Sequence, residues 1–146
     1  MPVIISGVRY SGSWTLQQQM QATAAGTWTN LPQLWSWGYN SSGQLGLGNT
    51  TNYSSPKQVG ALTNWSSVAC NSFSVAVKTN GTLWSWGYNY FGQLGDGTSV
   101  SKSSPVQIGA LTNWSTISGG NSHVMATRTD GTLWVWGNNA TGQLGQ

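Results

Sequence analysis

One phrase of thirteen residues occurs three times in this chain, as LWSWGYNSSGQLG from Leu34, LWSWGYNYFGQLG from Leu83 and LWVWGNNATGQLG from Leu133. The copies begin 49 and 50 residues apart. A fixed period of this length is the signature of repeat architectures, in which each unit buries its apolar face only against its neighbours. The phrase therefore predicts a row of similar units in place of one irregular core.

The repetition extends beyond the phrase. SSPKQVGALTNWSSVA (54–69) recurs as SSPVQIGALTNWSTIS (103–118) at an offset of 49, and VKTNGTLWSWG (77–87) recurs as TRTDGTLWVWG (127–137) at an offset of 50. The one extra residue is expected near Gly119–Gly120. We divide the chain into an N-terminal docking or capping segment, 1–33, two full repeats, 34–82 and 83–132, and a partial repeat, 133–146.

Each repeat is predicted to consist of short strands. SVAVKT and TLWSWG flank Asn-Gly, and MATRT and TLWVWG flank Asp-Gly, the residues typical of a β-hairpin with a two-residue type I′ turn. WSSVA and WSTIS indicate a further strand, and SPKQVGAL and SPVQIGAL another that begins at Pro56 or Pro105. Three to four strands per repeat, without a helical apolar period, predict an all-β fold made of β-propeller blades.

Alternation assigns roles inside the phrase. In a strand, Trp35 and Trp37 share one face, as do the Trp pairs of the second and third copies, while Leu34 and Ser36 point the other way. We expect the rings to fill the space between neighbouring blades. The Gly-Gln-Leu-Gly segment should turn sharply, and its Gln amide should satisfy backbone groups in that turn.

The residues needed for catalysis are scarce. The chain has no Glu, one His and two Asp, and both Asp96 and Asp130 occupy predicted turns. His123 lies at a strand start, where a structural role is the commoner one, and Cys70 has no basic neighbour in sequence to activate its thiol. We therefore predict no enzyme activity and no catalytic, cofactor-binding or metal site.

Charge is also sparse, at 5% of residues, with a formal net charge of +3. The five cations are scattered singly, whereas nucleic-acid binding usually relies on clustered Lys and Arg, so no nucleic-acid partner is expected. The first residues, MPVIISGVRYSG, do not form a signal peptide, and no stretch approaches the roughly 18 apolar residues of a membrane helix.

DGTLWVWGNNATGQLG and NGTLWSWGYNYFGQLGDG resemble the repeat of the RCC1 (regulator of chromosome condensation) family across about residues 34–146. The resemblance implies blades of a seven-bladed β-propeller. SGGNSHVMAT (118–127) also resembles the family's Gly-Gly-x-x-His segment, but the preceding repeat has Phe73 where the third has His123, which weakens a functional role for that histidine. Family members include exchange factors, ubiquitin-ligase modules, a photoreceptor and an enzyme inhibitor, so the resemblance implies fold more firmly than function.

Residues 1–33 lie outside the resemblance to RCC1 repeats. They include a possible first strand and a predicted short amphipathic helix with Trp14, Leu16 and Met20 on one side. The segment loosely resembles the leading segments of tailed-phage virion proteins that carry such repeats. A docking role in a virion and simple capping of the first blade both remain open.

The candidate interaction site is the loop inside the second phrase, Tyr88, Tyr90 and Phe91. The last two positions are Ser41-Ser42 in the first copy and Ala140-Thr141 in the third. A packed position would not tolerate this variation, so the loop is expected to be exposed, and exposed aromatic rings are typical binding anchors. The alternative is that the rings cover the neighbouring blade.

Two full periods and fourteen further residues amount to a little over two blades, whereas a seven-bladed ring needs about 350 residues. The expected architecture is an open arc or part of such a ring. Three explanations would account for the missing blades: a longer native chain, assembly of several copies into one ring, or a partner that covers the arc. We favour the longer native chain.

The predicted function is protein–protein assembly, as a structural or host-recognition component of a phage virion. The expected partners are other virion proteins, further copies of this chain or a host-surface ligand. A soluble regulator or inhibitor that docks a partner through its blade loops is the alternative.

Overall fold

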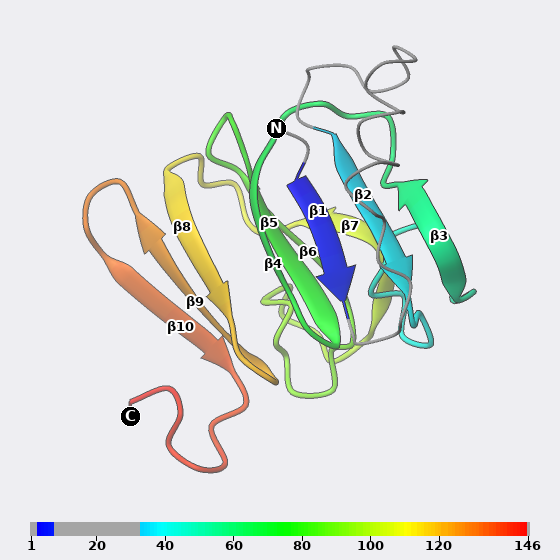
Figure 1. Cartoon of the computed structure of the whole chain (residues 1–146). Coiled ribbons are helices and arrows are strands. Elements are labelled where there is room, and N and C mark those ends of the chain that lie inside the picture. Colours follow the sequence, from blue (N-terminus) through cyan, green and yellow to red (C-terminus); the bar gives the residue numbers. More distant parts are fainter. Residues whose placement is uncertain (1–2, 8–32, 146) are drawn as a thin grey trace.

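The computed structural model describes residues 3–7 and 33–145, and the regular structure of these residues is entirely β (Figure 1). Its strands are β1 (Val3–Gly7), β2 (Leu34–Gly38), β3 (Tyr53–Gln58), β4 (Trp65–Cys70), β5 (Phe73–Lys78), β6 (Leu83–Gly87), β7 (Lys102–Gln107), β8 (Trp114–Gly119), β9 (His123–Arg128) and β10 (Leu133–Gly137). The predicted all-β fold is confirmed. The described part of the chain contains no helix that could span a membrane.

The strands form three sheets that follow one another like the blades of a propeller (Figure 1). The second sheet, β4-β5-β6-β7, is an antiparallel meander of consecutive strands. The first sheet has the order β1-β2-β3 and the third the order β10-β9-β8. The second and third sheets each join the end of one sequence period to the start of the next, because the repeated phrase begins with a strand, β6 or β10, that pairs with the strand before it.

The first sheet is completed by the N-terminus of the chain. β1 pairs with β2 in parallel, in register from Val3 opposite Leu34 to Gly7 opposite Gly38. It occupies the edge of β2 that corresponds to the edge of β6 covered by β5. The predicted N-terminal strand is therefore present, and the predicted helix around Trp14 lies outside the described residues.

The hairpin turns differ from the two-residue turn predicted from sequence. The Gly81 N–H donates to Lys78 O at 2.8 Å and the Lys78 N–H donates to Thr82 O at 3.0 Å, which closes a three-residue loop. Gly81 adopts a positive φ of 76°, and the Asn80 side chain accepts a hydrogen bond from the Thr82 hydroxyl at 2.7 Å. A type I turn followed by a left-handed glycine fits the twist of the two strands equally well.

Pro56 and Pro105 lie inside strands, whereas the sequence predicted them at the starts of strands. Pro105 is the fourth residue of β7, at the point where pairing with β6 shifts register between Ser85 opposite Val106 and Gly87 opposite Lys102. Pro56 has the same place in β3. A bulge in an outer strand accommodates the missing N–H, so the chain can continue extended through the proline.

Tryptophans join consecutive sheets, as predicted. The Trp86 side chain is fully buried, and its indole Nε1–H donates to Gln44 O in the preceding phrase at 3.0 Å. Trp136 makes the same bond to Gln93 O at 3.0 Å. A Cβ placed on Gly46 would lie only 2.6 Å from the Trp86 Nε1, so the ring packs directly on the glycine backbone.

In the third sheet only one tryptophan of the pair is packed as predicted: Trp136 is partly buried, whereas Trp134 is half exposed. Leu133 and Trp134 are 62% and 46% exposed, whereas Leu83 is 1% exposed. In the second sheet the Leu83 carbonyl accepts a hydrogen bond from Ile108, in the segment after β7. Within the described residues no strand follows β10 to cover the equivalent positions, so the outer face of this sheet remains open (Figure 1).

Replacing Trp86 with Ala should lower the free energy of unfolding by about 3–5 kcal/mol, because it removes a fully buried ring from the contact between sheets. Urea unfolding followed by circular dichroism measures the change. Trp134→Ala is the matched control, since this ring is half exposed, and its loss should be much smaller. Equal losses for the two variants would show that Trp86 has no special role between the sheets.

Candidate functional site: the aromatic loop of the second sheet

The candidate loop connects β6 to β7 and is organised around Asn89. This side chain is fully buried. Its Oδ1 accepts a hydrogen bond from Leu94 N at 2.9 Å, and its Nδ2 donates to Thr98 O at 2.9 Å and to Val100 O at 3.2 Å. One amide therefore fixes both the start and the return of the loop.

The Gln of the repeated phrase holds the tip of the turn, as predicted. Gln93 Oε1 accepts a hydrogen bond from Phe91 N at 2.9 Å. The same contact joins Gln44 to Ser42 at 2.9 Å and Gln143 to Thr141 at 2.8 Å. In the third repeat the Thr141 hydroxyl also donates to Gln143 Oε1, at 2.7 Å. The contact common to all three repeats is to the backbone of the residue at the tip, so that residue's side chain is free to differ between repeats.

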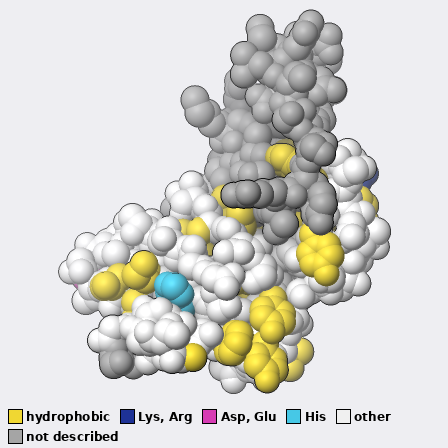
Figure 2. Space-filling view, turned by 60° about the horizontal axis from the view of Figure 1, so that its bottom comes forward, with side chains coloured by type: hydrophobic (Ala, Val, Ile, Leu, Met, Phe, Trp, Pro, Cys, Tyr) yellow, Lys and Arg dark blue, Asp and Glu magenta, His cyan; other side chains and the backbone are white. Residues whose placement is uncertain are grey.

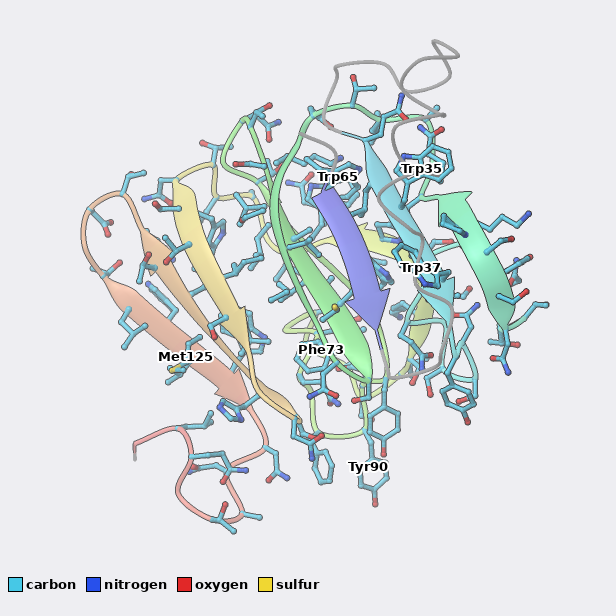
Figure 3. The ribbon with its side chains drawn as sticks, viewed as in Figure 1. Trp35, Trp37, Trp65, Phe73, Tyr90 and Met125 are labelled. Atoms are coloured by element: carbon cyan, nitrogen blue, oxygen red, sulfur yellow. The ribbon has the colours of Figure 1, made fainter. Side chains whose placement is uncertain are left out.

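In the second repeat the loop carries a cluster of three aromatic rings. Tyr88 and Tyr90 stack with centroids 6.4 Å apart and planes 12° apart, and Phe91 meets Tyr90 edge-on with centroids 5.0 Å apart. Tyr90 is 68% exposed and Phe91 42% exposed. Tyr90 projects from the end of the sheet (Figure 3), and hydrophobic side chains gather within a mostly polar surface (Figure 2).

The structure thus brings together all three residues predicted from the sequence and exposes the tip of the loop, as expected. The rings contact one another, in an arrangement that suits aromatic side chains. Their role as binding anchors stays a prediction.

Among the described residues, the loop carries one ion pair. Asp96 Oδ2 lies 3.6 Å from Lys102 Nζ, and Asp96 Oδ1 accepts hydrogen bonds from the Thr98 hydroxyl at 2.8 Å and from Asn89 Nδ2 at 3.1 Å. Partial burial by itself would raise the pKa of Asp96, but these hydrogen bonds and the Lys102 ammonium outweigh it, so the pKa lies below its ordinary value. The carboxylate therefore braces the loop.

The other candidates for chemistry lie apart. Asp130 occupies a hairpin turn and accepts hydrogen bonds from Thr132, while His123 begins β9. Cys70 ends β4, and burial raises the pKa of its thiol. Residues 3–7 and 33–145 contain no group of three His, Cys, Asp or Glu side chains able to hold a metal ion.

One arrangement was not predicted from the sequence: in the second sheet and again in the third, a basic side chain lies between two tryptophan rings. Lys78 Nζ is 3.5 Å from the ring centroid of Trp84 and 4.8 Å from that of Trp65. Arg128 lies 4.1 Å from Trp134 and 5.0 Å from Trp114. The available signal was a basic residue two positions before each Asn-Gly or Asp-Gly. Burial lowers the pKa of Lys78.

Family comparison identifies the repeat. The model of the Regulator of chromosome condensation (RCC1) repeat matches residues 33–77 and 80–127, and a second RCC1 repeat model matches 65–93 and 114–143. This chain belongs to the RCC1 repeat family. The matches cover most of the chain, as expected from the resemblance of its thirteen-residue phrase. A comparison with curated proteins found no match.

Solved structures of similar fold include human WBSCR16, with 25% sequence identity and a TM-score of 0.67 over 75% of this chain. Prp20p of Saccharomyces cerevisiae has 22% identity and a TM-score of 0.64 over 78% of this chain, and the same protein in complex with Kap60 has a TM-score of 0.65. The chain spans about 30% of the length of these structures. The RCC1-repeat chain therefore has the fold of part of a larger propeller.

The Asp96 carboxylate should stabilise the RCC1-repeat chain only where it is ionised. Because its pKa is lower in the folded protein than in the unfolded one, the stabilisation is present above the unfolded pKa, about 3.9, and disappears as pH falls through the lower folded value. Asp96→Asn should therefore be less stable than the parent at pH 7, with the difference shrinking below pH 4. Urea unfolding at several pH values measures it. A difference independent of pH would contradict the proposed bracing.

Proposed function

We propose that this RCC1-repeat chain is a non-enzymatic protein-binding module, and that the aromatic loop of Tyr88, Tyr90 and Phe91 is its contact with a partner. The observation that carries the proposal is the combination of exposed rings with a buried clamp. Aromatic side chains are enriched among residues that dominate binding energy, and fixed rings lose little conformational freedom on binding.

The setting of the loop supports the same role. Asn89 and Gln93 hold the backbone of the loop through side-chain hydrogen bonds, so a partner would meet a preformed surface. The fold relative Prp20p is described as binding Gsp1p and histones and has been solved with Kap60. Prp20p is similar to this chain in fold, at 22% sequence identity. The similarity therefore supports protein binding as a class of function and suggests no particular partner.

We further propose that the module works in a phage virion, where it assembles with other virion proteins or with copies of itself, or recognises a host surface. A charged content of 5% leaves a surface dominated by Ser, Thr, Asn and Gln, which suits packing within a neutral assembly. The pairing of β1 with β2 ties the start of the N-terminal segment to the first sheet. The segment's loose resemblance to the leading segments of virion proteins also favours this setting.

The second candidate is a soluble regulator or inhibitor that docks a partner through the same loop. The similarity of fold to Prp20p favours it, since that protein is described as binding Gsp1p and histones. In neither case does the proposal require catalysis: the Asp and His side chains among the described residues occupy separate turns and strand ends.

Replacing Tyr90 and Phe91 together with Ser should abolish partner binding and leave the fold intact, because Ser-Ser is what the first repeat carries on the same clamp. Binding is measured by pull-down from lysate of the source cells or particles, followed by titration with the recovered protein. Val100→Ser, at a 61% exposed position without the rings, is the control and should bind normally. Undiminished binding by the Tyr90→Ser, Phe91→Ser variant would exclude the loop as the contact.

The virion setting predicts that the protein copurifies with intact particles through a density gradient and is detected by mass spectrometry at a fixed ratio to the major structural proteins. The soluble regulator predicts recovery in the particle-free fraction, bound to a discrete partner. Absence from purified particles would overturn the virion proposal and leave the aromatic-loop proposal standing.

A further inference from the structure

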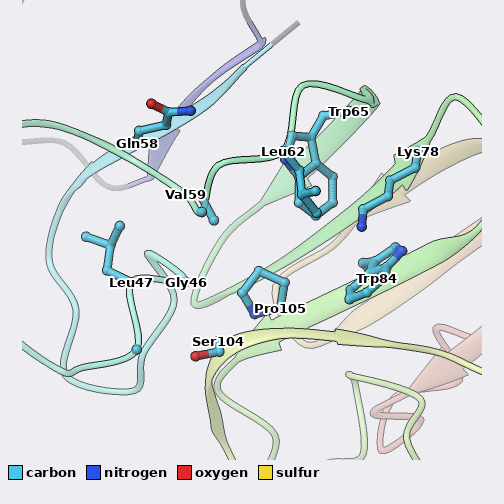
Figure 4. Close-up of a pocket in the computed structure, with 12 residues that line it drawn as sticks. Gly46, Leu47, Gln58, Val59, Leu62, Trp65, Lys78, Trp84, Ser104 and Pro105 are labelled. Atoms are coloured by element: carbon cyan, nitrogen blue, oxygen red, sulfur yellow. The ribbon is translucent and has the colours of Figure 1, made fainter.

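A hollow of about 390 Å³ lies between the first and second sheets, and Ser104 and Pro105 of β7 line one side of it (Figure 4). Apolar side chains, including Leu47, Val59, Leu62 and Pro105, form much of its wall. Trp65 and Trp84 also line it, together with Lys78. The volume lies in the range typical of small-molecule sites, and the pattern of apolar walls with one charged group is also typical of them.

Lys78 gives the hollow its chemical character. Its side chain is 5% exposed, and its ammonium ends above the ring of Trp84, facing the space between Leu62 and Pro105 (Figure 4). Among the described residues it has no carboxylate partner, since the ion pair they contain joins Lys102 to Asp96. The two indole faces offset part of the cost of burying this charge, but they accept none of its three N–H donors in a conventional hydrogen bond.

The indole Nε1–H of Trp65 is buried and has no hydrogen-bond partner, but the same holds for Trp114 in the third sheet, so this feature belongs to the repeat and does not mark a ligand. Lys78 is the group that gives the hollow a preference for an acceptor. Its side chain is buried without a carboxylate partner among the described residues, whereas buried charges in native proteins are normally paired.

We infer that this hollow binds the carboxylate of a small apolar organic acid. The carboxylate oxygens would accept hydrogen bonds from the Lys78 ammonium, and the apolar body would lie against Val59, Leu62 and Pro105. The charge is complementary, and a hydrogen bond between an ammonium and a carboxylate is charge-assisted. The inference is independent of the aromatic loop and of any partner that the loop binds.

The third sheet provides an internal comparison. Arg128 lies between Trp114 and Trp134 as Lys78 lies between its own pair, but there Trp134 is 46% exposed, and no strand equivalent to β7 is present among the described residues. The cation between two indoles thus forms there without a covering strand. What sets Lys78 apart is the apolar wall supplied by the neighbouring segments, so Arg128 is the matched control position.

The test is a titration of the ¹⁵N-labelled chain with sodium phenylacetate, followed by amide and indole NMR shifts. Phenylacetate should perturb the Trp65 and Trp84 indole signals and bind at least about 10-fold more tightly than phenylacetamide, its neutral isostere, as expected for a hydrogen bond to a charged group. Lys78→Met, which keeps the length and packing of the side chain, should reduce phenylacetate affinity by a similar factor. Arg128→Met and Tyr90→Ser should leave it unchanged.

Equal affinity for phenylacetate and phenylacetamide would overturn the inference, because the hollow would then be an apolar surface without an anion site. So would binding that survives in Lys78→Met, or the absence of any shift at Trp65 and Trp84. The comparison of the two probes uses the unmodified chain, so it decides the question even if Lys78→Met fails to fold. A peptide that ends in Gly-Phe with a free carboxylate carries the same chemistry; tighter binding than phenylacetate would support a chain terminus as the natural source, and weaker binding a free acid.

Discussion

The contact on which the rest of the structure depends is a tryptophan indole laid on the glycine backbone of the preceding repeat. Trp86 packs against Gly46 and donates to Gln44 O, and Trp136 repeats the hydrogen bond to Gln93 O. A Cβ at Gly46 would prevent the approach, so the glycine and the indole are needed together. The same short segment that turns the loop therefore also joins one sheet to the next.

The residues that hold the loop in place are different from the residues that it exposes at its tip. Asn89 and Gln93 hold the loop through backbone atoms, and their counterparts in the first and third repeats make equivalent bonds. The bond that all three repeats share involves only the backbone N–H of the residue at the tip, although in the third repeat the Thr141 hydroxyl also donates to Gln143. One repeat can therefore present Tyr90 and Phe91 while another presents serines, at little cost to the fold.

A repeat protein also depends on the unit that comes next. In the second sheet Leu83 is covered and the ring of Trp84 forms one wall of the hollow beside Lys78, whereas Leu133 and Trp134 in the third sheet are open. The sequences around these positions are nearly the same, so the difference lies in the presence of the neighbouring strand. Nearest-neighbour contacts thus determine which copies of one motif form a core, a pocket or an exposed face.

The sequence by itself determined the period, the strands, the buried tryptophans between sheets, the Gln clamp and the exposure of the aromatic loop, because these depend on alternation and on turn residues that act locally. It predicted the wrong hairpin turn and misplaced Pro56 and Pro105, since several turn types share Asn-Gly and a bulge can absorb a proline. The structure was needed to reveal the pairing of β1 with β2, because these strands are far apart in sequence, and the placing of Lys78 between Trp65 and Trp84, because three strands must pack together to form it. Local signals report the conformation of a segment, whereas the neighbours that it meets depend on the packing of the whole chain.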